Sequence, residues 1–285
     1  MCYLKTFDPT VPMMYFACVM SICVFTSNPY LQACSLAGGI MLLIFVKGRR
    51  SVRLLIGCAL IMAVMGATNP LFVHRGLTEL FFVGDSPYTL EALLYGLSLG
   101  CSIASLLIWF SVFNAVISQD DILAVFGKRL PKTALVISMI LGFIPKLRRK
   151  YTELLHAQYG SGVSRKPSLK RTAAVFTACL SAQSERVIDI SMSMKARGYG
   201  LKSRTFAHRR RFRKKDAAAI AVPLALCIAC FVYIGSGKLD YWYYPRLSPG
   251  GFEPAAVMCY LLLCILPVFF IVKEKFLWRN CPAKT

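Results

Sequence analysis

The chain has 285 residues, of which 56% are hydrophobic and 16% charged, and its formal net charge is +21. A soluble domain needs fewer apolar residues than this, and residues 92–118 contain no charged side chain at all. Because a helix of about 20 apolar residues spans a lipid bilayer, the composition excludes an ordinary soluble protein and predicts an integral membrane protein.

Six apolar segments are candidates for transmembrane helices. They are residues 11–27, 30–46, 54–68, 92–118, 217–237 and 255–272. We therefore expect a membrane domain of about four spans over residues 1–118, a polar insert over 119–216, and about two spans with a tail over 217–285. The predicted fold is all-α and polytopic, with about six transmembrane helices.

The basic residues are distributed unevenly between the two sides of the predicted bundle. The loops 69–91 and 238–254 contain only Arg75, Lys238 and Arg246, whereas all other Lys and Arg residues fall on the opposite side, the insert included. This asymmetry follows the positive-inside rule, so we predict a cell-membrane protein with both termini in the cytoplasm. Topology and contact with anionic membrane lipids explain the charge, and nucleic-acid binding is not expected.

Most of the 12 cysteines lie in the apolar segments, where cysteine behaves as a small hydrophobic residue. Cys227 and Cys230 form a C-x-x-C pair inside a predicted span, without a second pair or a nearby histidine. We therefore expect neither a disulfide framework nor a metal site.

The insert begins with a short amphipathic helix, residues 120–130, which ends before Pro131. A first long helix follows from Lys132, and its most apolar part, 134–144, is too short to span the membrane. We expect this helix to begin at the membrane surface and to leave it. Its apolar stripe contains Ile140, Ile144, Leu147, Tyr151, Leu154 and Leu155.

A second long amphipathic helix is predicted from Ser168 to about Arg197, after a break at Gly160-Ser161-Gly162 and Pro167. Its apolar residues recur at intervals of seven, with Gln183 as the one polar member of the stripe. This spacing predicts a helix packed along another helix. The four residues that define it are Ala173, Leu180, Val187 and Met194.

The second long helix ends in Lys195-Ala196-Arg197-Gly198. Gly198 suits a left-handed C-cap and a cation in the last turn suits the helix dipole, so the segment can be simply a well-capped helix. Alternatively, small neighbours let Arg197 project from a rigid tip into an acidic groove of a soluble partner.

The segment Met194-Lys195-Ala196-Arg197-Gly198-Tyr199 resembles the Ala-Arg-Gly signature of the transmembrane T component of energy-coupling factor (ECF) transporters, the EcfT/CbiQ family. Three other segments look like the family's pattern. They are Asn69-Pro70-Leu71-Phe72 with His74-Arg75-Gly76, Leu130-Pro131 through Phe143-Ile144-Pro145, and Arg204-Thr205-Phe206.

The resemblance implies a non-catalytic subunit of an ABC importer for vitamins or metal ions. Two cytoplasmic coupling helices would dock into two ABC ATPase subunits and pass their movement to a separate substrate-binding S component. The chain itself would bind no cofactor, because its partners bind the ATP. The implied docking residues are Ala196, Arg197 and Gly198 at one tip and Ala157, Gly160, Ser161 and Gly162 at the other.

The first tip departs from the family pattern. It reads Ala157-Gln158-Tyr159-Gly160-Ser161-Gly162, with Ser161 at the position of the arginine. Either backbone and hydroxyl contacts engage that groove, or Arg165 substitutes. We expect asymmetric docking, in which Arg197 is the stronger anchor.

Two other classes of function remain open from the sequence. A stand-alone channel or secondary transporter with a cytoplasmic regulatory domain would have charged residues or broken helices in mid-membrane, and Pro223 and Pro267 are compatible with such breaks. A membrane enzyme would need clustered polar residues, which are not evident. The Gly235–Lys238 segment is no Walker A loop, because Val232 and Leu239 occupy positions that require Gly and Ser or Thr.

Overall fold

The computed structural model describes residues 8–73, 76–83, 86–160, 169–199, 214–244 and 253–279. Over these residues the chain is almost entirely helical, as predicted. It divides into two compact units, one formed by Met1–Ile122 with Arg211–Thr285 and the other by Leu123–Arg210. The second unit lies within the insert expected at 119–216.

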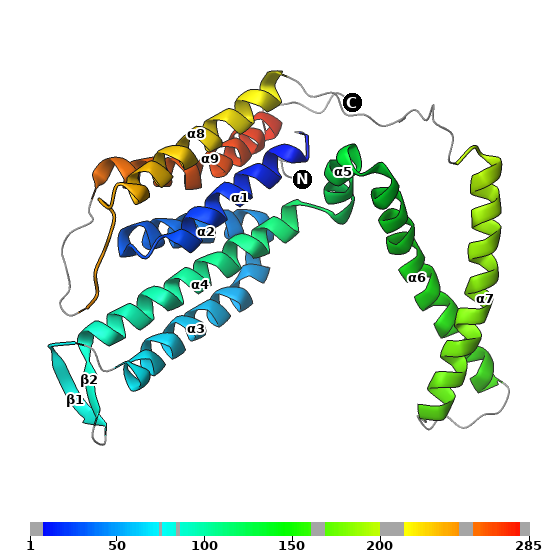
Figure 1. The fold of residues 1–285 in the computed structure, drawn as a ribbon, viewed down its shortest axis with the longest axis horizontal. Coiled ribbons are helices and arrows are strands. Elements are labelled where there is room, and N and C mark those ends of the chain that lie inside the picture. Colours follow the sequence, from blue (N-terminus) through cyan, green and yellow to red (C-terminus); the bar gives the residue numbers. More distant parts are fainter. Residues whose placement is uncertain are drawn as a thin grey trace. The chain divides into compact units, whose positions relative to one another are not determined.

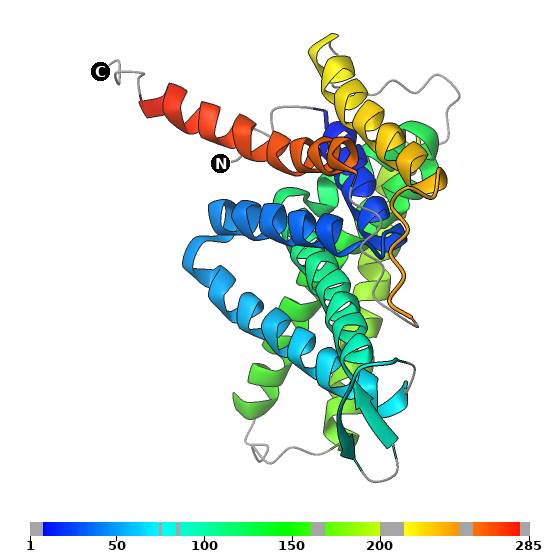
Figure 2. The same cartoon turned by 90° about the vertical axis from the view of Figure 1, so that its left-hand side faces the viewer.

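The first unit is a bundle of apolar helices (Figures 1 and 2). They are α1 (Thr10–Phe25), α2 (Pro29–Lys47), α3 (Ser51–Phe72), α4 (Leu90–Val116), α8 (Lys214–Gly235) and α9 (Pro254–Arg279). A single 3-10 turn, Gly48–Arg50, joins α2 to α3, and Gly48 adopts a φ of +57°. Glycine is the residue that enters this left-handed region without strain, so the chain can turn there between two apolar helices.

Three helical stretches are long and apolar enough to cross a membrane: Pro29–Phe72, which contains the turn at Gly48, Leu90–Val116 and Asp216–Gly235. Thr10–Phe25 and Pro254–Phe269 are shorter apolar helices. Large apolar side chains cover the outside of the unit, among them Ile56, Leu60 and Val232, each at least 64% exposed. Such a surface is compatible with a membrane protein, because lipid rather than water is its favourable surrounding.

Helix α4 is the centre of the unit, because it packs on α1, α2 and α3. Its contact with α3 is very close. A Cβ on Gly96 would lie 2.5 Å from the Met65 carbonyl oxygen, and one on Gly100 would lie 2.8 Å from the Met62 Cα. The Gly-x-x-x-Gly spacing thus lets the two backbones approach each other, as in membrane helix pairs.

Several buried polar groups in the bundle form hydrogen bonds between helices. The Trp109 indole donates to Ser35, the Tyr15 hydroxyl donates to the Leu263 carbonyl at 3.0 Å, and Ser98 donates to Gln32 at 2.8 Å. An unpaired polar group would be costly in an apolar interior. These bonds therefore fix which helix faces meet.

A β-hairpin between α3 and α4 departs from the all-α prediction. Strand β1 (Glu79–Val83) pairs antiparallel with β2 (Ser86–Thr89). The sequence offered a signal for it, since aromatic strand formers flank the turn-favouring pair Gly84-Asp85. Its position between two predicted spans indicates only that residues 69–91 form a loop.

The second unit contains α6 (Pro131–Gly160), α7 (Leu169–Ala196) and most of α5 (Gln119–Arg129). A capping box starts α5: the Ser118 hydroxyl donates to the Asp121 carboxylate at 2.6 Å, and the Asp121 amide donates to the Ser118 hydroxyl at 3.2 Å. Pro131 then begins α6, a favourable first position for proline. The predicted short helix and the limits of both long helices are confirmed to within one or two residues.

The α3–α4 contact yields a first prediction. Gly96→Ala should destabilise the protein by roughly 1–3 kcal/mol, because the new methyl group meets backbone atoms that cannot move away. Gly57→Ala is the matched control on α3, since nothing lies within 4 Å of its Cβ position. Thermal unfolding in detergent measures both. Equal midpoints for the two variants would contradict the close α3–α4 contact.

Candidate functional site

The two long helices of the second unit cross, and the crossing lies in the C-terminal half of α6 and the N-terminal half of α7 (Figure 1). The Cys179 thiol of α7 lies 3.8 Å from the Leu147 carbonyl oxygen of α6. Because the helices run in opposite directions through this crossing, their C-terminal ends lie on opposite sides of it. At a rise of about 1.5 Å per residue, Arg197 is about 27 Å along α7 from Cys179, and Gly160 is about 20 Å along α6 from Leu147.

The face of α7 buried at the crossing is not the face predicted from the seven-residue stripe. The buried residues are Val175, Cys179 and Gln183, at four-residue spacing. Gln183 is therefore the member of the predicted stripe that is buried. Of the four residues expected to pack the helices together, Ala173, Leu180 and Val187 are exposed and Met194 is half-buried. The face of α7 that is buried lies about a quarter of a turn around the helix from the predicted face, and the packing prediction is corrected accordingly.

The contact between α6 and α7 is small. Beyond Gln183, residues 184–193 of α7 are all exposed, and before the crossing Ile137, Ile140 and Ile144 of α6 are 47%, 54% and 55% exposed. Among the described residues, the Gln183 Oε1 atom is buried without a hydrogen-bond partner. An unpaired buried amide oxygen weakens the contact, so only a few interactions hold the two helices together.

The end of α7 is a Schellman motif. The Tyr199 amide donates to the Met194 carbonyl and the Gly198 amide to the Lys195 carbonyl, both at 3.0 Å. Gly198 has a φ of +80°. This is the geometry of a left-handed C-cap, and the predicted cap at Gly198 is confirmed. The cap satisfies the last carbonyl groups and fixes the direction in which the chain leaves the helix.

Arg197 is held by this cap and is exposed. Its amide donates to the Ser193 carbonyl at 3.1 Å, which continues the helical pattern by one residue. Within the described part of the chain, its guanidinium pairs with no carboxylate. Ala196 beside it is exposed and Gly198 is half-buried. A planar cation between two small residues on a rigid end can form a bidentate pair with an external carboxylate.

The end of α6 is described only in part. Ala157 and Gly160 are exposed, and the helix continues through Gly160. A Cβ on Gly160 would meet nothing within 4 Å, so this tip also has open space around it. Ser161, Gly162 and Arg165 lie outside the described residues, and the structure does not bring the complete motif into view.

The segment Asn69-Pro70-Leu71-Phe72, which resembles the family pattern, is the end of α3 in the first unit. The Asn69 amide group donates to the Ala92 carbonyl at 2.6 Å, and the Glu91 carboxylate accepts from the amides of Leu77 and Thr78. A Cβ on Gly76 would lie 2.6 Å from Glu91 Oε2. These contacts fasten the end of α3 to the start of α4, which is a structural role.

The remaining motif positions are placed as follows. Leu130-Pro131 is the α5–α6 junction, and Pro145 lies inside α6. His74, Arg75 and Arg204-Thr205-Phe206 are outside the described residues. Within the described residues, no group of three or more His, Cys, Asp or Glu side chains could hold a metal ion.

A scan against models of known protein families finds no match to this chain, and a search of curated proteins finds none either. The resemblance to the EcfT/CbiQ family therefore rests on the motif residues alone.

The C-cap of α7 yields a second prediction. In Gly198→Ala, a side chain is forced into the left-handed region at a cost of about 1–2 kcal/mol, which frays the helix end. Hydrogen exchange of the backbone amides at 198 and 199 should become at least fivefold faster. Gly142→Ala, at an open site within α6, should leave these two amides unchanged; the same acceleration in both variants would refute the role of the cap.

The unpaired oxygen of Gln183 yields a third prediction. Gln183→Met keeps the side-chain length and removes the buried amide, so it should stabilise the α6–α7 contact by about 1 kcal/mol. Hydrogen exchange of the amides from Val175 to Gln183 should then slow about fivefold. Glu185→Met places the same side chain at an exposed neighbouring position and is the control. Slower exchange in the control alone, or in neither variant, would place Gln183 outside the contact.

Proposed function

We propose that this chain is the transmembrane energy-coupling subunit of an ECF-type ABC importer for vitamins or metal ions. In this role it transmits ATP-driven movements of two ATPase subunits to a separate substrate-binding membrane subunit. The observation that carries the proposal is the end of α7, where a Schellman cap presents an exposed Arg197 between Ala196 and Gly198, and no carboxylate of the described residues pairs with it.

The opposed directions of α6 and α7 support docking of two motor subunits. Each helix presents its C-terminal end on a different side of the crossing at Cys179 (Figure 1). Two ATPase subunits that approach each other on binding ATP would then move two separate tips. Arg197 would pair with a carboxylate in one groove, while the tip containing Ala157, Gly160, Ser161 and Gly162 would dock without an arginine in the family position.

The small contact between the helices suits a moving part. Three buried α7 side chains hold the crossing, and the oxygen of one of them, Gln183, has no hydrogen-bond partner among the described residues. A contact of this kind can adopt two arrangements that differ by a few kcal/mol, and nucleotide-driven motors can select one of them. The helix segments between the crossing and the two tips are long. A small rotation of α6 relative to α7 would therefore move each tip over a large distance.

The exposed apolar surfaces of the second unit offer a place for the S component. Val187 and Leu180 on α7 are 49% and 43% exposed, and Ile140 and Ile144 on α6 are more than half exposed. Water makes such surfaces costly. A membrane-embedded partner that covers them would receive the movement of both helices.

Six transmembrane helices, α1, α2, α3, α4, α8 and α9, belong to the proposed topology. The basic insert and both termini would lie in the cytoplasm, in contact with anionic lipids. The proposal assigns no catalysis to the chain, and ATP is bound by its partners. Pro223 and Pro267 lie inside continuous helices, so neither marks the unwound segment that a stand-alone channel or secondary transporter would use there.

The fourth prediction tests the α7 tip. Arg197→Ala should reduce the amount of ATPase that co-purifies with the tagged chain at least tenfold, because a desolvated partner carboxylate would lose its counter-ion at a cost of roughly 2 kcal/mol or more. Ser161→Ala should have a much smaller effect. Arg186→Ala, an exposed arginine on the same helix, controls for the loss of one positive charge.

Substrate uptake by cells should follow the same order as complex yield. Equal losses for Arg197→Ala and Arg186→Ala would mean that the charge of α7, rather than its tip, attracts the partner. Equal losses for Arg197→Ala and Ser161→Ala would contradict asymmetric docking.

A further inference from the structure

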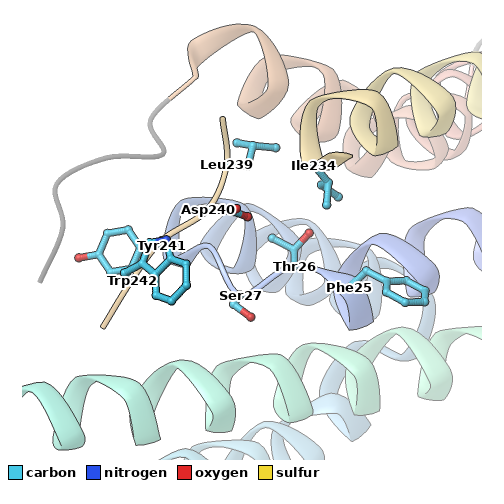
Figure 3. Close-up of a pocket in the computed structure, with 8 residues that line it drawn as sticks. All are labelled: Phe25, Thr26, Ser27, Ile234, Leu239, Asp240, Tyr241 and Trp242. Atoms are coloured by element: carbon cyan, nitrogen blue, oxygen red, sulfur yellow. The ribbon is translucent and has the colours of Figure 1, made fainter. Parts of the chain in front are cut away.

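A small pocket lies in the first unit, between the α1–α2 connection and the end of α8 (Figure 3). It has a volume of about 270 Å³, and its lining includes Phe25, Thr26 and Ser27 on one side and Asp240, Tyr241 and Trp242 on the other. The pocket residues lie outside α6 and α7, and the proposed coupling mechanism does not involve them.

Two hydrogen bonds hold the pocket walls in place. The Asn28 amide group donates to the Leu239 carbonyl at 3.1 Å, and the Tyr243 hydroxyl donates to the Ser27 carbonyl at 3.1 Å. These bonds fasten residues 239–243 across the turn between α1 and α2. The pocket is therefore formed before any ligand arrives, which lowers the cost of binding.

Thr26 is the unusual residue of the pocket. It is only 5% exposed, and its Oγ1 atom is buried without a hydrogen-bond partner among the described residues. Figure 3 shows its side chain pointing from the α1–α2 connection into the space below Ile234, near Asp240. Buried hydroxyl groups are nearly always hydrogen-bonded, so this oxygen lacks the partner that such a group ordinarily has.

The other groups of the lining favour a positively charged donor. The Asp240 side chain is exposed at the pocket and forms no ion pair within the described residues. Tyr241 and Trp242 contribute aromatic faces, which attract cations. A carboxylate, an unpaired hydroxyl oxygen and two aromatic rings together match an ammonium group, which can donate several hydrogen bonds.

We propose that the pocket binds a primary ammonium group, carried by a phosphatidylethanolamine headgroup or by a small soluble amine. The ammonium donates to Thr26 Oγ1 and to the Asp240 carboxylate, while Trp242 covers it. Trp242 and Phe25, at opposite ends of the lining in Figure 3, are 67% and 68% exposed, and each offers an apolar surface along which an attached chain can leave the pocket. A quaternary ammonium group such as choline has no N–H to donate and should bind less well.

The test uses the full-length chain in detergent. Its tryptophan fluorescence, to which Trp242 contributes, is followed during titration with short-chain phosphatidylethanolamine, short-chain phosphatidylcholine and ethanolamine. Phosphatidylethanolamine should bind saturably and about tenfold more tightly than phosphatidylcholine, the loss expected for hydrogen bonds to a charged group. Ethanolamine that binds as tightly as the lipid identifies a soluble amine as the ligand, whereas ethanolamine that does not bind identifies the lipid.

Two variants separate the pocket from general lipid binding. Thr26→Val keeps the side-chain shape and removes the unpaired oxygen, and Asp240→Asn removes the charge. Each should weaken phosphatidylethanolamine binding about tenfold, whereas Ser236→Ala, outside the pocket lining, should not change it. The proposal is overturned if the two lipids bind equally, or if both variants bind phosphatidylethanolamine like the unmodified chain. Neither result bears on the docking of ATPase subunits.

Discussion

The contact on which the coupling account depends is the crossing of α6 and α7, where the Cys179 thiol meets the Leu147 carbonyl. The two helices run in opposite directions through the crossing. Their C-terminal tips therefore lie on opposite sides of it. It is also narrow, because it buries Val175, Cys179 and Gln183 and leaves the rest of α7 largely exposed. A broad apolar seam would make the pair a rigid block. A small contact that includes the Gln183 amide oxygen, which has no partner among the described residues, can instead hold α6 and α7 together while the angle between the two helices changes.

The first unit packs apolar helices whose outer surface is compatible with lipid, and in lipid no hydrophobic driving force would hold such helices together. Close backbone approach at Gly96 and Gly100 and hydrogen bonds such as Trp109 to Ser35 supply the specific contacts. The capping box of Ser118 and Asp121 then begins α5 within three residues of the end of α4. The same chain thus combines a tightly packed bundle with a loosely packed helix pair, and the second property is the one that the proposed function uses.

The helical class, the limits of the long helices and the cap at Gly198 could be predicted from the sequence, because they follow from local rules of hydropathy, proline and glycine. The buried face of α7 could not. Leu180 and Val187 are apolar and were expected to pack, yet the crossing selects Cys179 and Gln183, since the angle between two helices decides which short stretch touches. The hairpin Glu79–Thr89 was not predicted, although the turn-favouring pair Gly84-Asp85 separates its two strands in the sequence. The pocket at Thr26 joins segments more than 200 residues apart, and no local pattern connects them.

The central claim is that the chain works as a coupling subunit together with two nucleotide-driven motors. Native mass spectrometry of the tagged chain, purified in mild detergent from membranes of the cell in which it normally functions, tests this most directly. The account predicts a complex that contains two ATP-hydrolysing subunits for each copy of this chain, together with a second small membrane protein. A chain that is isolated without ATPase subunits, and that moves a solute across liposome membranes by itself, would contradict the account.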